Sequence, residues 1–203
     1  MRLIEQSDTV RFAAALLLAA GCSPRRAGPA VEPPAALVSA LASAREAYPE
    51  LAAARVELRE MRAEQFFFMA QPEWRHAFRR SGARTYRISY DPAVLADGPS
   101  AEALAGVMAH ELGHILEYAR LGGLGLADFG LRYLCVREFR IAHERDTDFE
   151  ALVRGFGPGL AAYERWALGR LSGAALRVKR ETYLSPEEIE AWVRDKSEAQ
   201  AGG

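Results

Sequence analysis

The sequence predicts a mixed α+β domain with a small β-sheet near its start and a mostly helical second half. Two observations carry this prediction: strand-like patterns are confined to residues 55–90, and apolar residues recur at helical spacing from residue 100 onward. The chain has 203 residues, half of them hydrophobic and 26% charged, which suits a domain with one substantial core. Its formal net charge of −1 gives no indication of a nucleic-acid partner.

The amino-terminal segment, residues 1–21, is typical of a secretion signal. Its apolar run at residues 12–20 has the length of a signal-peptide core and is too short to cross a bilayer as a helix. The run ends in Leu-Ala-Ala-Gly-Cys22, which resembles a bacterial lipobox, although Ala19 stands where that pattern usually has a larger aliphatic residue. A buried Ala/Leu helix is the alternative interpretation.

The lipobox resemblance implies that the thiol of Cys22 is acylated and that a lipid, not a spanning helix, attaches the chain to a membrane. We therefore expect a cell-envelope location, lipid-anchored at the periplasmic face, with Ser23 compatible with the outer membrane. Residues 22–33 are rich in Pro, Arg, Ala and Gly and predict a flexible tether, which leaves residues 34–203 for the folded domain.

The first elements of this domain are a helix and three strands. Apolar residues at helical spacing predict a helix over 35–48, ended by Pro49. Alternating or aromatic segments then predict strands at residues 55–59, 65–70 and 85–90, which form a small sheet with one apolar face. The three phenylalanines of the second segment are expected in the core.

Helices are expected throughout the second half. Ser100 is a suitable N-cap for the first of them, and Ser-Pro-Glu-Glu from Ser185 is a strong start signal for the last. The predicted helices cover residues 100–121, ended by the glycines of 122–125, then 127–142 and 143–154, separate or continuous, 159–169, and a final helix from 185. Cys135 lies in an apolar helical pattern and is expected to be buried.

The motif His110-Glu-Leu-Gly-His114 lies inside the helix predicted over 100–121. Residues four apart stand one helical turn above each other, so both imidazoles project from one face and can occupy two corners of a zinc tetrahedron. Glu111 is rotated by about 100° from His110, which suits a base acting on metal-bound water. The alternative is a pair of surface histidines, but the chain has only four histidines and a chance match is rare.

A third ligand is expected downstream, because two histidines do not complete a catalytic zinc site. Glu144 and Asp148 are one helical turn apart, so Glu144 could complete the metal site while Asp148 accepts a hydrogen bond from a ligand histidine. His143 and Asp148 remain alternatives for the third ligand, and a solvated charged face is the bland interpretation. Candidate donors to an oxyanion, which the sequence does not rank, are His143, Tyr163 and Arg165.

Together, HExxH and the later ExxxD resemble the gluzincin clan of zinc metallopeptidases, the thermolysin-like group. The resemblance implies a zincin-like fold, zinc ligands at His110, His114 and Glu144, a general base at Glu111 and an orienting acid at Asp148. These five positions carry the match.

The resemblance covers about residues 100–155. Strand 85–90 also lies where such folds place the edge strand that pairs with an extended substrate. The sequence departs from related patterns in two places: no Gly-x-x-His follows His114, so the metzincin pattern is absent, and residues 121–141 match nothing position by position.

The sequence therefore predicts zinc-dependent hydrolysis of peptide bonds, with Zn²⁺ as the cofactor, Glu111 as the base and a peptide or protein as the substrate. Two alternatives stay open. One is a catalytically silent zincin-fold lipoprotein that serves in binding or assembly at the cell envelope. The other is a purely structural zinc site, which needs four protein ligands.

Overall fold

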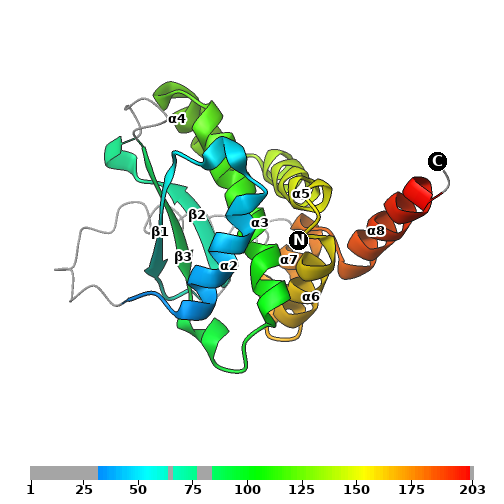
Figure 1. Ribbon diagram of the computed structural model, residues 1–203. Helices are drawn as coiled ribbons and strands as arrows, with labels where there is room; N and C mark the ends of the chain where they lie inside the picture. Colours follow the sequence, from blue (N-terminus) through cyan, green and yellow to red (C-terminus); the bar gives the residue numbers. More distant parts are fainter. Residues whose placement is uncertain (1–31, 64–65, 77–83, 202–203) are drawn as a thin grey trace.

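The computed structural model describes residues 32–63, 66–76 and 84–201 (Figure 1). The predicted signal segment, the predicted lipidation site Cys22 and all but the last two residues of the predicted tether lie outside these ranges. Within the described residues, no helix combines the length and the apolar character needed to cross a bilayer.

The fold is mixed α+β, with a small sheet followed by a mostly helical half, as the sequence predicts. Its first half consists of helix α2 (Ala35–Glu46) and strands β1 (Arg55–Glu60), β2 (Phe68–Pro72) and β3 (Thr85–Tyr90). Its second half consists of α3 (Ala101–Arg120), α4 (Gly123–Cys135), α5 (Arg137–Val153), α6 (Gly157–Leu168), α7 (Gly173–Thr182) and α8 (Pro186–Ala201). Short 3-10 turns occur at Pro49–Leu51, Trp74–His76 and Pro92–Leu95.

The three strands form one sheet in the order β1-β3-β2. Strand β3 is central, parallel to β1 and antiparallel to β2. The prediction that segment 85–90 is an edge strand is therefore wrong. Strand β3 has the most deeply buried side chains of the three, with Tyr86, Ile88 and Tyr90 all buried, and a strand flanked on both sides accommodates them best.

The edge strand beside α3 is β2. It begins at Phe68 and not at residue 65, which lies outside the described residues. Its ladder to β3 is framed by the Asp91 N–H donating to the Phe67 carbonyl and the Glu73 N–H donating to the Thr85 carbonyl, at 2.8 and 2.9 Å. Because main-chain groups alternate in direction along a strand, those of Phe68 and Ala70 point away from β3.

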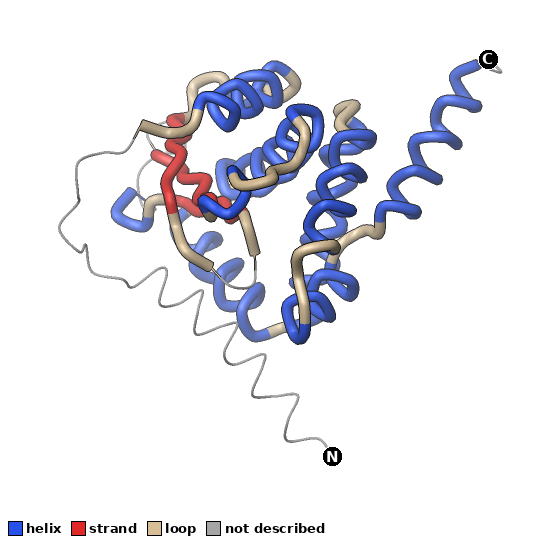
Figure 2. The backbone as a smooth tube through the Cα atoms, turned by 90° about the horizontal axis from the view of Figure 1, so that it is seen from below, coloured by secondary structure: helices blue, strands red, loops and turns tan. Residues whose placement is uncertain are grey.

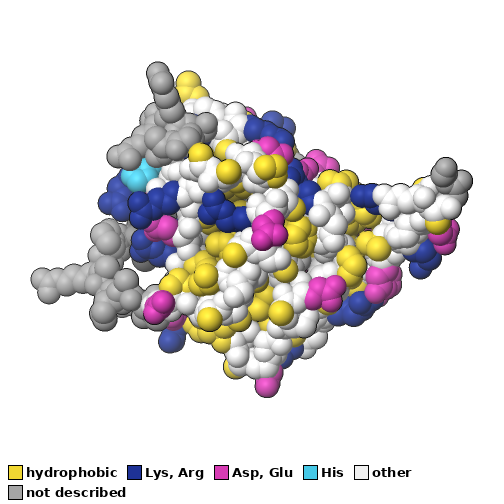
Figure 3. Space-filling model, in the orientation of Figure 1, with side chains coloured by type: hydrophobic (Ala, Val, Ile, Leu, Met, Phe, Trp, Pro, Cys, Tyr) yellow, Lys and Arg dark blue, Asp and Glu magenta, His cyan; other side chains and the backbone are white. Residues whose placement is uncertain are grey.

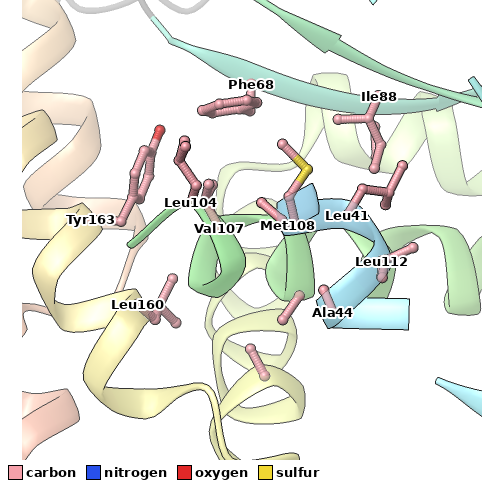
Figure 4. Close-up of a cluster of buried hydrophobic side chains, with 14 of the residues drawn as sticks. Leu41, Ala44, Phe68, Ile88, Leu104, Val107, Met108, Leu112, Leu160 and Tyr163 are labelled. Atoms are coloured by element: carbon pink, nitrogen blue, oxygen red, sulfur yellow. The ribbon is translucent and has the colours of Figure 1, made fainter. Parts of the chain in front are cut away.

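Helix α3 lies in the middle of the fold and packs against α2, α5, α6 and β2 (Figure 1). Figure 4 shows its core face, where Val107 and Met108 lie below Phe68 of the sheet, and Leu160 of α6 lies further down on the side of Val107. Ser100 caps the helix by accepting the Ala103 N–H at 3.2 Å, as its sequence predicts. Because neighbours cover α3 on several sides, its polar residues 110, 111 and 114 are also buried.

Helices α3 and α6 approach each other closely at two glycines. A Cβ on Gly106 would lie 2.3 Å from the Leu160 nitrogen, and one on Gly159 would lie 2.3 Å from the Glu102 carbonyl oxygen. Both distances are far below van der Waals contact, so only glycine allows this backbone-to-backbone packing. It fixes α6 as one wall beside the face of α3 that carries His110.

The largest departures from the predicted helices lie between residues 121 and 184. The helix break is at Val136, with φ −114° and ψ 102°, and not between residues 142 and 143. The glycines of 122–125 follow the end of α3 and also form the start of α4. The polar helix α7 is not predicted by the sequence. Starting α5 at Arg137 places its buried residues on one stripe: Arg140, Glu144, Thr147, Asp148, Ala151 and Leu152.

Cys135 is exposed, so the prediction of a buried thiol is wrong. Helix α4 has apolar residues on two faces, and it buries the face that carries Leu126. Leu124 and Leu131 share the outer face with Cys135 and are 83% and 63% exposed. An apolar pattern on a helix that packs on one side only does not identify the side that is covered.

Seen from below, the sheet lies at one flank of the helical body and α8 projects from the opposite flank (Figure 2). Helix α8 packs on α6 through its first turns, and its last turns are exposed. On the face shown in Figure 3, acidic and basic side chains occur together with exposed apolar ones, in line with the small net charge.

Candidate metal centre

Three side chains from two helices converge inside the protein. His110 and His114 stand one turn apart on α3, and their Nε2 atoms are 3.1 Å from each other. Glu144 reaches them from α5, with Oε2 3.3 Å from each of the two Nε2 atoms. All three residues are buried, and together they could hold a metal ion.

Asp148 lies one turn after Glu144 and holds the ring of His110. Its Oδ1 is 2.8 Å from His110 Nδ1, and its Oδ2 accepts the main-chain N–H of Leu184 at 2.9 Å. A carboxylate accepts here, so the Nδ1 hydrogen points to Asp148 and Nε2 is the ring nitrogen of His110 that faces the cluster. Both oxygens of Asp148 are thus engaged away from the three converging atoms.

His143 orients the second histidine in a similar way. Its Nε2 lies 2.9 Å from Nδ1 of His114. For His114 to offer the Nε2 lone pair, its Nδ1 must carry the hydrogen and donate it to His143. Burial, together with the charge of His114, lowers the pKa of His143 to about 3, which keeps this acceptor neutral. The structure therefore places His143 behind His114, and not among the three converging side chains.

Tyr133 of α4 holds Glu144 from the other side. Its hydroxyl donates to Oε1 of Glu144, which leaves Oε2 facing the two histidines. The Oε2 atom is buried, and its polar neighbours are the Nε2 atoms of the two histidines. Sequence reasoning did not identify Tyr133, since it lies in the segment that matches no motif and on a different helix from the residue that it contacts.

The electrostatics of the cluster favour a cation. Burial alone would raise the pKa of Glu144, but the charges and hydrogen bonds of His114 and His110 outweigh it and hold that pKa well below its usual range. Burial alone would lower the pKa of His110, but hydrogen bonds to Asp148 and Glu144 raise it to about 10. The carboxylates of Glu144 and Asp148 thus favour a positive charge at this point, and a divalent metal ion meets the same requirement.

Glu111 is buried on the adjoining turn of α3. The main-chain N–H of Ala70 on the edge strand β2 is hydrogen-bonded to its carboxylate, while Oε2 has no hydrogen-bond partner. Burial is the main cause of a raised pKa for Glu111. A carboxylate with one oxygen free and a raised pKa is suited to accept a proton from a reacting group.

A cavity of about 390 Å³ opens beside the cluster and is lined by His110, Glu111, His114 and Glu144. Tyr163 also lines it, in edge contact with Phe68 at 5.9 Å between ring centroids. Tyr183, which the sequence did not suggest, lines it as well and lies 5.8 Å from the His110 ring.

Arg165 does not lie in the cavity wall. It forms an ion pair with Glu190, and both side chains are 49% exposed. The suggestion that Arg165 stabilises an oxyanion is therefore wrong. On helix α6, Arg165 is only two residues from Tyr163, but this spacing turns the two side chains to different sides of the helix.

No protein-family model matches the chain, and no curated protein or solved structure compared with it is significantly similar. What the fold and the site define is a mixed α+β protein whose buried His-His-Glu group could hold a metal ion.

Proposed function

We propose that this chain is a zinc-dependent metallopeptidase of the gluzincin type with a zincin-like fold, in which His110, His114 and Glu144 bind Zn²⁺. The spacing of the three donor atoms is the observation that carries the proposal. A tetrahedral zinc ion with bonds of about 2.0–2.1 Å holds its ligand atoms about 3.3 Å apart. The three separations in this protein are 3.1, 3.3 and 3.3 Å.

The residues around the ion have separate tasks in peptide hydrolysis. Zinc at this site would polarise the substrate carbonyl and lower the pKa of a coordinated water to about 7. Glu111 takes the proton from the attacking water through its free Oε2 and later delivers it to the leaving amine. Tyr163 and Tyr183 keep their phenolic protons because burial raises both pKa values, so their hydroxyls are the candidate donors to the oxyanion.

The edge strand β2 supports a peptide as the substrate. It lines the cavity, and in the described sheet it pairs with β3 alone. The main-chain groups of Phe68 and the carbonyl of Ala70 point away from β3, so an extended peptide can add to this edge by main-chain hydrogen bonds. The Ala70 N–H is engaged by Glu111, which brings the base and the peptide-binding edge together.

Two features favour catalysis over the silent and the structural alternatives. Three donors converge, and among the described residues no fourth His, Cys, Asp or Glu joins them, whereas a structural zinc site needs four. A catalytically silent protein whose own chain fills the cleft would not need the cavity that adjoins the donors and Glu111.

Metal analysis combined with a peptidase assay tests the proposal. The purified wild-type protein should bind one zinc ion per chain and cleave members of a quenched fluorescent peptide library. Glu111→Gln should keep the zinc and lose activity by a factor on the order of 10²–10⁴. Glu117→Gln, on the exposed side of the same helix, is the matched control and should keep both. Zinc binding without cleavage of any peptide would favour the silent alternative, and loss of zinc in the Glu111 variant would make Glu111 a structural residue.

We further propose that the protein is lipid-anchored in the cell envelope through Cys22. Cys22→Ser should move it from the membrane fraction to the soluble fraction, because a lipid anchor supplies the membrane affinity. Cys135→Ser is the control, since it removes the other cysteine of the chain and should leave the distribution unchanged. Equal behaviour of the two variants would contradict the lipobox interpretation.

A further inference from the structure

A buried ion pair lines the cavity on the side formed by α6 and α7. Nζ of Lys179 lies 2.7 Å from Oε1 of Glu164, and the two side chains are only 13% and 3% exposed. Lys179 also lies over the ring of Tyr183, 3.5 Å from its centroid. The same ring is 5.8 Å from that of His110, so Tyr183 lies between the ion pair and the metal centre.

The fold itself does not account for this pair. Taking two charges out of water is costly, and well-packed apolar residues of similar volume often hold a fold equally well or better. Helix α7, which carries Lys179, has Thr182 as its single fully buried residue, so the helix does not depend on a large apolar face. The role of the pair is therefore sought in the cavity that it lines.

Outside the metal centre, the rest of the cavity wall is almost entirely apolar. Among the described residues that line the cavity, Lys179 is the one Lys or Arg, and the acids other than Glu164 are Glu111 and Glu144. The apolar part of the wall includes Phe66, Phe67, Leu126, Leu134, Leu171 and Val178. Of the described wall, the ion pair is thus the one charged feature that a ligand meets away from the metal centre.

We propose that the Lys179–Glu164 pair sets the charge selectivity of the cavity, which takes a bulky, uncharged, apolar side chain of the substrate. While both partners are present, the wall is electrically neutral. A charged side chain would then lose its water without finding an unpaired charge of opposite sign. If Glu164 is removed, the ammonium group of Lys179 is left to pair with an anion. If Lys179 is removed, the buried carboxyl of Glu164 is left to pair with a cation, which can take the place of the lost ammonium group. The inference rests on the proposed function only in identifying the ligand as a peptide side chain.

Binding of small probes tests this selectivity without requiring hydrolysis. Three probes share one phenyl ring and chain length and differ in charge: 3-phenylpropanol, 3-phenylpropanoate and 3-phenylpropylamine. Their dissociation constants are measured by calorimetry on the metal-free wild-type protein and on Glu164→Gln, Lys179→Met and the double variant. The three donor residues and Glu111 are the same in all four metal-free proteins, so their own affinity for a charged probe cancels when one protein is compared with another.

Wild type should bind the alcohol most tightly. Glu164→Gln should gain tenfold or more for the carboxylate, and Lys179→Met should gain similarly for the amine, on the order expected when an isolated buried charge regains a partner. The double variant should return to the wild-type order of probe affinities. Because it leaves no unpaired charge, it also tests the wall if one of the single variants does not fold. Unchanged preferences in a folded single variant, or equal binding of all three probes to wild type, would overturn the inference.

Failure of the proposed function gives a different result. In that case the zinc-loaded wild type would cleave no peptide, while the probes would still show the charge preference and its reversal in the variants. If the wild type cleaves peptides but the probe preferences do not respond to Lys179 or Glu164, the peptidase stands and the ion pair is only structural.

Discussion

Replacing Tyr133 by Phe isolates one hydrogen bond of the proposed metal centre. The substitution removes the hydroxyl that donates to Oε1 of Glu144 and keeps the ring, which lies 6.0 Å from both Phe129 and His143 between centroids. The three donor atoms themselves are untouched. Any change in metal affinity therefore reports how well Glu144 is held in place.

The size of the effect follows from the burial of Glu144, which is 1% exposed. A hydrogen bond to a charged group contributes about 1.5–3 kcal/mol. Since about 1.4 kcal/mol corresponds to a factor of ten, the dissociation constant for zinc should rise about ten- to hundredfold, the range typical of groups that orient metal ligands. Water does not readily replace the lost hydroxyl at so buried a carboxylate.

Competition with a chromophoric zinc chelator at neutral pH measures the dissociation constant directly. Tyr118→Phe is the matched control, because Tyr118 lines the same cavity and stacks on His114 with centroids 6.2 Å apart. Among the described contacts its hydroxyl donates to none of the three donors. If the zinc affinities of the two variants agree within a factor of two, Tyr133 does not position Glu144 and the reasoning is refuted.

Two further predictions concern stability. Gly106→Ala should destabilise the protein by about 1–3 kcal/mol through overpacking against α6, despite a gain of about 1 kcal/mol in helix propensity. Gly125→Ala is the control and should keep that gain, because its Cβ would meet its nearest neighbour at an ordinary 3.5 Å. Chemical unfolding that gives a stability change of the same sign for both variants would contradict the close approach of α3 and α6. The Ser185 main-chain N–H and then Arg145 lower the pKa of Glu188, so its stabilisation is present above its ordinary pKa and is lost as the pH falls through the lowered value. Glu188→Gln should therefore cost at most about 1 kcal/mol at pH 7, since the pair with Arg145 is partly exposed. Thermal unfolding should show the difference from wild type shrinking as the pH is lowered below the ordinary range of a glutamate, and a difference that grows in acid would contradict this assignment.

The parts of the site that the sequence predicted depend on local geometry. His110 and His114 share a face because four residues make about one helical turn, and the same rule places Glu144 beside Asp148. Residue spacing alone therefore selected His110 and His114, whereas the third donor stayed open between Glu144, His143 and Asp148 until the packing of α5 on α3 brought Glu144 to the two histidines. The start of α3 was equally predictable, because a Ser N-cap acts within a single turn.

The parts that the sequence did not predict depend on how elements pack against one another. Tyr133 of α4 meets Glu144 of α5 across the break at Val136, and Lys179 of α7 meets Glu164 of α6. Strand order is also non-local: alternation in residues 85–90 indicated a strand but not that β3 would lie between its two neighbours. Period-2 patterns define the buried face of a strand, not its position in the sheet.

Most contacts of the site depend on the register of one helix, α5. Residues 143, 144 and 148 have three different tasks: His143 orients His114, Glu144 joins the converging donors, and Asp148 orients His110. One step along the helix turns a side chain by about 100°, so a slip of α5 by one residue would remove all three contacts together. The Leu184 N–H, which binds the second oxygen of Asp148 from the segment between α7 and α8, opposes such a slip. The proposed metal centre and the carboxyl-terminal helices are thus linked through the carboxylate of Asp148, although they are far apart in the sequence.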